Sequence, residues 1–138
     1  MLLMPRKVKF RKSQKGKIRG ISSRGHRMHF GEFGLKSLEN GLVKAGHIEA
    51  SRVIVARKLK GAGKFWVNIF PHKPVTKKPA ETRMGKGKGD LDHWVAVVKR
   101  GKVLFELGGI PEDFARIVFR LVAFKLPVKT RFITRVEH

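Results

Sequence analysis

Cysteine is absent from the 138-residue chain, and acids are scarce, since 10 Asp and Glu stand against 32 Lys and Arg. Without cysteine the chain has neither a disulfide framework nor a thiolate metal site, which fits a reducing compartment among others. No apolar run approaches the roughly 20 residues of a membrane-spanning helix. The apolar part of MLLMPRKVKF is too short for a signal-peptide core. We therefore expect a soluble protein that acts where it is made.

The charge balance is the most extreme property of the sequence, with a formal net charge of +22. Repulsion among so many cations destabilises a compact state unless a polyanion neutralises them. A chain of this length can still form one domain, because 41% of its residues are hydrophobic. The composition therefore predicts a folded core together with a polyanionic partner.

The first 31 residues contain ten cations and no acid. We define residues 1–25 as the basic arm and predict one α+β RNA-binding domain over residues 26–138. Glycines and a shortage of large apolar side chains mean that the arm cannot offset its ordering entropy by burial, so its order would come from its partner. Phe10 has no core to join and is a candidate for stacking on a base. The candidate RNA-binding residues of the arm are Arg6, Lys7, Lys9, Phe10, Arg11, Lys12, Lys15, Lys17, Arg19 and Arg24.

The first half of the domain predicts strands around one helix. The segment HFGEFGLKSL is consistent with one or two short strands, interrupted at Gly31 and Gly34. Helical spacing predicts a helix over residues 45–60, ended by the glycines at 61 and 63. A strand follows in GKFWVNIF. The expected apolar stripe of the helix is Ala45, Ile48, Val55, Ala56 and Leu59.

Prolines at positions 71, 74 and 79 argue against sheet pairing and predict a long loop over residues 71–90. The runs HWVAVVK and KVLFEL then predict two strands joined as a tight hairpin through Arg100 and Gly101.

A second helix is expected from Pro111 to Leu126, followed by a strand in VKTRFITRV. The apolar residues at helical spacing are Phe114, Ile117, Val118, Leu121 and Phe124. Most aromatic residues are expected in the core, including Phe65, Trp94, Phe105, Phe114 and Phe124. The element order predicts an α+β fold, with two helices packed on a mostly antiparallel or mixed sheet.

The densest mixture of glycine and charge is RMGKGKG, residues 83–89, which we name the Gly-Lys segment. A mononucleotide loop would need G-x-x-x-x-G-K-[ST] or G-x-G-x-x-G before a helix, and neither pattern is present. A plain solvated loop is the alternative, but the charge of the chain favours contact with a polynucleotide. The candidate RNA- and tRNA-binding residues of the loop are Lys73, Lys77, Lys78, Arg83, Met84, Gly85, Lys86, Gly87, Lys88 and Gly89.

Other clusters give weak signals for chemistry. Asp90, Asp92 and His93 lie where the loop meets a strand, where local capping explains them as well as catalysis does. The spacing of His26 and His29 would allow them to chelate a metal only if they lay on a helix. The sequence around them shows no helical periodicity. We therefore predict no catalytic residue, no metal site and no cofactor. The alternative function is that of another RNA-binding or RNA-processing protein, such as a nuclease.

Several segments together resemble the ribosomal large-subunit protein sixteen family. RMGKGKG followed by DLDHW, and preceded by GKFWVNIFPHKPVTKKP, is similar to the signature region of that family. MPRKVKFRKSQKGKIRG, HFGEFGLKSLE, HIEASRV, GKVLFELGGIPE and FKLPVKTRFITR resemble its other segments in the same order, so the similarity covers essentially the whole chain. His72 departs from the F-P-D-K-P pattern of bacterial members.

The resemblance implies a fold, partners and a location. It implies an α/β-hammerhead-like domain that binds twenty-three-S rRNA in the large ribosomal subunit, beside neighbouring ribosomal proteins, in the cytoplasm of a bacterium or in an organelle. It also implies that the basic arm and the Gly-Lys segment approach tRNA at the aminoacyl site and at the adjacent peptidyl site. It implies that the protein is not an enzyme and has neither a small-molecule substrate nor a membrane partner.

Overall fold

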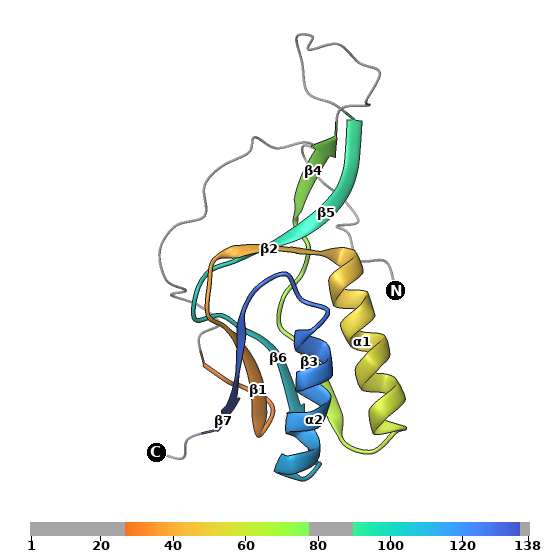
Figure 1. Ribbon diagram of the computed structural model, residues 1–138, viewed down its shortest axis with the longest axis vertical. Coiled ribbons are helices and arrows are strands. Elements are labelled where there is room, and N and C mark those ends of the chain that lie inside the picture. The colour runs from red at the N-terminus through yellow and green to blue at the C-terminus, as the bar shows by residue number, and fades with distance from the viewer. Residues whose placement is uncertain (1–26, 78–89, 136–138) are drawn as a thin grey trace.

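Two antiparallel sheets and two α-helices make up the described part of the chain, residues 27–77 and 90–135 of a computed structural model (Figure 1). The four-stranded sheet has the order β3-β6-β1-β7, with bounds Lys64–Val67, Val103–Gly108, Phe33–Ser37 and Thr130–Thr134. The three-stranded sheet has the order β2-β5-β4, with bounds Gly41–Lys44, Asp90–Val98 and Lys73–Lys77.

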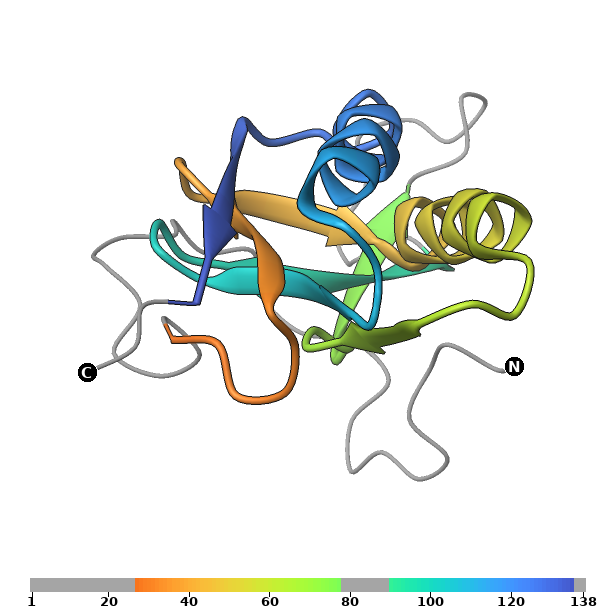
Figure 2. The same ribbon diagram turned by 90° about the horizontal axis from the view of Figure 1, so that it is seen from below.

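The helices lie next to each other on one side of the sheets (Figure 2). Helix α1, Ala45–Leu59, contacts β2 and β5, whereas α2, Glu112–Ala123, contacts β1 and β7. Strand β6 is buried at all six residues, and its Phe105 stacks on Phe65 of β3. One hydrophobic cluster joins the helices to both sheets. The predicted α+β fold, with two helices packed on antiparallel sheets, is confirmed.

The predicted hairpin between β5 and β6 is wrong. The chain does turn at Gly101, whose φ is +94°, but β5 pairs with β2 and β4 while β6 pairs with β1 and β3. Backbone groups of the turn bind the end of β1 and the connection that follows it: Gly101 N–H donates to Ser37 O, and Arg100 N–H donates to Asn40 Oδ1. These contacts direct the two strands into different sheets.

The prediction of one unpaired loop over residues 71–90 is also wrong. Lys73–Lys77 form β4, and Pro74 lies opposite Trp94 of β5. Proline is tolerated there because β4 is an edge strand, so its missing N–H can face away from the partner strand. Residues 78–89 of the predicted loop lie outside the described part of the chain.

The helix faces differ in detail from the predicted stripes. In α1, Ile48, Val55 and Leu59 are buried as predicted, but Ala56 is exposed and Ser51 is buried. Helix α2 ends at Ala123, and its buried residues are Ala115, Val118, Phe119 and Val122. Ile117 and Phe124 are 56% and 77% exposed, so their predicted core positions are wrong. The face that packs is displaced by about one residue from the predicted one, and its Phe119 meets the ring of Phe132 on β7 edge-on, with centroids 6.1 Å apart.

The early strands also differ from the prediction. Strand β1 runs through Gly34 without interruption, and β2 was missed. Side chains pack closely on Gly34, since a Cβ there would lie 2.7 Å from the sulfur of Met28, which would have to move. The last strand is confirmed as β7, with Phe132 stacked on Phe33.

Candidate nucleic-acid interface

Two of the predicted RNA-binding residues, Lys73 and Lys77, fall in the described part of the chain, where both belong to β4. The other loop residues and all the arm residues lie outside it, from Arg6 to Arg24 and from Lys78 to Gly89. Lys77 is paired with Asp90 in the register of β4 and β5. The pairing therefore brings together the two chain ends that flank residues 78–89.

The β4-β5 pair extends beyond the helices at one end of the molecule (Figure 1). Its inner end is anchored by Trp94, Val95 and Ala96, which are buried. The pair is antiparallel, with a register shift between Val75 and Thr76. Residues that follow Lys77 and precede Asp90 are thus attached to a sheet that belongs to the core.

A buried carboxylate fixes the chain where it enters the described structure. Glu106 of β6 is fully buried, and its Oε1 accepts hydrogen bonds from the backbone N–H groups of His29, Phe30 and Gly31 at 3.0, 3.0 and 3.1 Å. Its Oε2 accepts one from Asn68 Nδ2 at 2.7 Å. Three successive N–H groups around one anion form a compact binding nest. The segment that follows the basic arm is therefore held on the central strand of the sheet.

The same contacts determine the ionisation of Glu106. Burial is the strongest influence and by itself would raise the pKa of this carboxyl. The hydrogen bonds from Asn68 and from the backbone of Phe30, Gly31 and His29 together outweigh it, so the pKa lies below its ordinary value of 4.5. Glu106 is consequently an anion at neutral pH, with its charge directed at backbone donors.

Other acids of the described residues are likewise used within the fold. Glu39 accepts a hydrogen bond from the backbone N–H of Lys129, and Asp113 accepts one from Phe114. Glu32 receives a long one, 3.4 Å, from Gly109. The other two acids whose side chains the structure describes, Glu49 and Glu112, pair with arginines on their own helices. Four of the six described acidic side chains therefore bind backbone donors and not cations.

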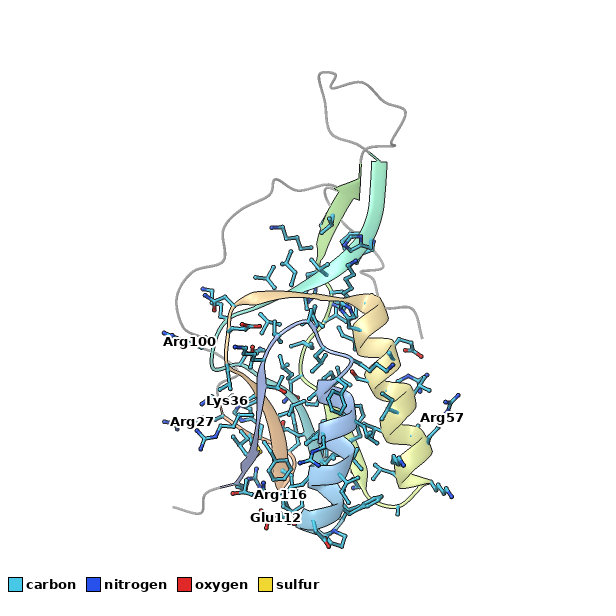
Figure 3. The ribbon with its side chains drawn as sticks, in the orientation of Figure 1. Arg27, Lys36, Arg57, Arg100, Glu112 and Arg116 are labelled. Carbon is cyan, nitrogen blue, oxygen red and sulfur yellow. The ribbon has the colours of Figure 1, made fainter. Side chains whose placement is uncertain are left out.

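The cations, by contrast, lie on the surface in large number. Figure 3 shows Arg27, Lys36 and Arg100 on the side of the molecule opposite to Arg57 of α1. Exposed charge thus covers several faces and reaches both helices and both sheets. The exposed Lys and Arg residues without one of these two ion pairs are Arg27, Lys44, Arg57, Lys58, Lys60, Lys64, Lys99, Arg100, Arg120, Lys125, Lys129, Arg131 and Arg135.

A groove at the inner end of the β4-β5 pair was missed by the sequence analysis. It has a volume of about 860 Å³ and lies between the connection from β3 to β4 and the strand β5. Its lining includes Phe70 and His72, whose ring centroids are 4.7 Å apart, together with Lys73 and Lys102. The only sequence signal for this groove was the aromatic and basic run FPHK. Because the neighbouring prolines predict a loop, this run was expected to belong to the loop.

The weaker candidates have ordinary places in the structure. Trp94 is buried in the core, as predicted, and His29 is exposed. Asp90 and His93 belong to β5. Among the residues that the structure describes, no three His, Asp or Glu side chains are grouped as a metal site. Neither α1 nor α2 is long and apolar enough to cross a membrane.

Comparison with known proteins identifies the family. The family model described as ribosomal protein L16p/L10e matches residues 5–133. The chain is 56% identical over 136 residues to the large ribosomal subunit protein uL16 of a Sulfurihydrogenibium species, covering 99% of each chain. It is 52% identical to the uL16 proteins of Christiangramia forsetii, over 99% of each chain, and of Leptospira biflexa, over 97% of this chain and 98% of that one. A match of this extent shows that the chain belongs to the ribosomal protein L16p/L10e family.

Proposed function

We propose that this protein is a structural constituent of the large ribosomal subunit in the cytoplasm, where it binds rRNA and helps to shape the site that receives aminoacyl-tRNA. Neighbouring ribosomal proteins are its other partners. The names of its relatives support the assignment to the large subunit. Membership of a family of ribosomal proteins makes its role structural, so the nuclease alternative is set aside.

The observation that carries this proposal is the unequal use of charge. The six acids whose side chains are described bind backbone N–H groups or arginines on the same helix, whereas most exposed Lys and Arg residues of the ranges 27–77 and 90–135 lack such a partner. A net charge of +22 then needs a polyanion nearby. Ribosomal RNA supplies one phosphate for each nucleotide, and phosphate contacts position a protein without requiring a particular sequence.

The β4-β5 pair supports a specific role for the Gly-Lys segment. Residues 83–89 lie between two strands whose ends are paired at Lys77 and Asp90, so their attachment points are fixed relative to the core. Lysine supplies charge, and glycine permits close approach of the backbone to a crowded polyanion. We therefore assign tRNA contact to this segment and rRNA contact chiefly to the basic arm.

The test replaces Lys86 and Lys88 by alanine and measures tRNA binding to reconstituted large subunits. We expect the double variant to bind aminoacyl-tRNA more weakly while its isolated form melts at the wild-type temperature. The matched control is Arg57→Ala with Lys58→Ala, which removes the same charge from an exposed part of α1. Equal weakening by both double variants would reduce the effect to net charge alone and would contradict the assignment to the Gly-Lys segment.

A further inference from the structure

We infer that the groove at the inner end of the β4-β5 pair receives one unpaired RNA nucleotide, with its base on the Phe70 and His72 rings and its phosphates near Lys73 and Lys102. This inference rests on the proposed function, because it names a second contact through which the same protein holds RNA. The contact differs in kind from those of the basic arm, since it recognises a base and not only phosphate charge.

The aromatic pair supplies the surface for stacking. The Phe70 and His72 rings lie 4.7 Å apart between centroids, inclined by 50°, and both residues are exposed. Phe70 retains 37% of its accessible surface although it follows the buried Ile69. Val97 on β5 adds apolar surface to the lining and is 46% exposed. An unpaired base stacks favourably on such rings because every base has a flat π-face.

The charge of the groove selects an anionic occupant. Lys73 and Lys102 line it, whereas no Asp or Glu is part of its lining. A purely apolar protein segment would have to leave two ammonium groups beside it without counter-charge. A nucleotide satisfies both parts of the lining, since its base is apolar on its faces and its phosphate is anionic.

The shape of the groove favours an unpaired nucleotide over a duplex. Bases inside an A-form helix are inaccessible to side chains in its deep, narrow major groove, whereas unpaired bases can be splayed out and stacked on aromatic rings. The volume, about 860 Å³, is within the range of pockets that hold small organic molecules. The groove is therefore large enough for a single extruded nucleotide.

The frame around the groove is already ordered. Asn68, in the lining, donates its backbone N–H to Leu104 O at 2.9 Å and its side-chain Nδ2 to the buried Glu106. Ala96 and Pro74, also in the lining, are buried. A preformed site avoids the entropy cost of ordering loops on binding. Stacking energy at this site would therefore appear directly as affinity.

The experiment uses the full chain and two fluorescent RNA probes of equal length. One is an oligoadenylate that carries a single 2-aminopurine, and the other has the same backbone without bases. We expect Phe70→Ala to weaken oligoadenylate binding roughly 5- to 150-fold and to leave binding of the abasic strand unchanged. We also expect wild-type protein, but not the variant, to quench 2-aminopurine fluorescence by stacking.

Two further variants separate stacking from folding. Phe70→Leu keeps an apolar side chain at the groove but removes the ring, so it should retain the wild-type melting temperature and still lose the quenching. Phe124→Ala removes a phenylalanine that is 77% exposed on α2 and does not line the groove, so it should bind both probes as wild type does.

Wild-type affinity and wild-type quenching in both Phe70 variants would overturn the inference, as would an equal loss for both probes. The Phe70 variants could also bind RNA as wild type does and yet fail to assemble into the large subunit. The occupant of the groove would then be a protein segment, and the inference would again be wrong. Failure of the proposed function is distinct, because wild-type protein would then bind neither probe in a salt-dependent way.

Discussion

Strand β6, next to β1 and β3, is buried at all six of its residues, whereas β5, the centre of the three-stranded sheet, exposes Val97 to a groove. Strand β6 also carries Glu106, whose charge is satisfied internally by four hydrogen bonds. The groove beside β5 is lined by Lys73 and Lys102 and by no acid. We propose from this difference that the four-stranded sheet chiefly stabilises the fold, while the groove beside β5 presents groups to a partner.

The largest expected effect tests the stabilising role of β6. Glu106→Ala would leave three backbone N–H groups and the Asn68 amide without their acceptor, and the N–H of Gly31 among them is buried. Leaving a buried hydrogen-bond donor without its acceptor costs about 1–3 kcal/mol. We expect a loss of this size in the free energy of unfolding, measured by urea titration with tryptophan fluorescence. A loss below about 1 kcal/mol would show that the four-stranded sheet does not depend on this carboxylate.

A second, smaller effect concerns acid. Because the pKa of Glu106 is lower in the folded state than its ordinary value of 4.5, its charge stabilises the fold above that value, and this stabilisation is lost as pH falls through the folded-state pKa. Glu106→Gln keeps an acceptor oxygen and cannot titrate. We expect the unfolding free energy of wild type to fall more steeply below pH 4.5 than that of the variant. Parallel curves would contradict the ionised state of Glu106.

The start of α1, next to the three-stranded sheet, should show an intermediate effect of about 1 kcal/mol. His47 Nδ1 accepts a hydrogen bond from the backbone N–H of Lys44, where β2 passes into α1, and so caps the helix. Loss of such a cap by His47→Ala costs about 0.5–2 kcal/mol. Urea titration of the variant at neutral pH measures this cost.

The same residue predicts a pH dependence. Burial, Lys44 and His93 lower the pKa of His47 from 6.5, so the folded state favours the neutral ring that can accept the hydrogen bond. The stabilisation is present above pH 6.5 and is lost as pH falls through the folded-state pKa. We expect His47→Ala to remove this part of the pH dependence; an unchanged curve would exclude His47 as its source.

The smallest effect on stability is expected in the groove. Lys73→Ala with Lys102→Ala should change the unfolding free energy by no more than about 0.5 kcal/mol, since the side chains are partly exposed and unpaired in the lining. The same double variant should bind RNA more weakly, with a salt slope reduced by about 1.4 for two lost phosphate contacts. A large loss of stability would show that the groove stabilises the fold as the four-stranded sheet does, and would contradict the proposed difference between the two sheets.

The sequence predicted elements whose signals are local. Spacing gave helix α1 almost to the residue, and the alternation of Phe132 with charged neighbours gave β7. The pairing of strands depends on contacts that are distant in the sequence. The turn at Gly101 has the composition of a hairpin, yet it contacts Ser37 and Asn40, and the strands on its two sides belong to different sheets. Pro74 predicts a loop because the sequence does not reveal that its strand, β4, lies at the edge of a sheet.

For the candidate interface, the sequence predicted charged segments but neither the groove beside β5 nor the contacts of Glu106. Charge density singled out the basic arm and the Gly-Lys segment, and all of those residues lie outside the described structure. The anchoring role of Glu106 depends on N–H groups some 75 positions earlier in the chain, which no local pattern contains. An acid inside the apolar run KVLFEL was the available signal, because a charge is buried in such a strand only when it is satisfied there.

The most direct measurement is the affinity of the full chain for large-subunit rRNA as a function of salt concentration. If half of the sixteen cations in residues 1–31 and 71–90 each meet a phosphate, at about 0.7 per contact, log K should fall with log salt at a slope of roughly −5.6. That slope corresponds to about 10³-fold weaker binding between 50 and 200 mM salt. A slope near zero would show that the surplus cations do not neutralise RNA phosphates and would contradict the proposed function.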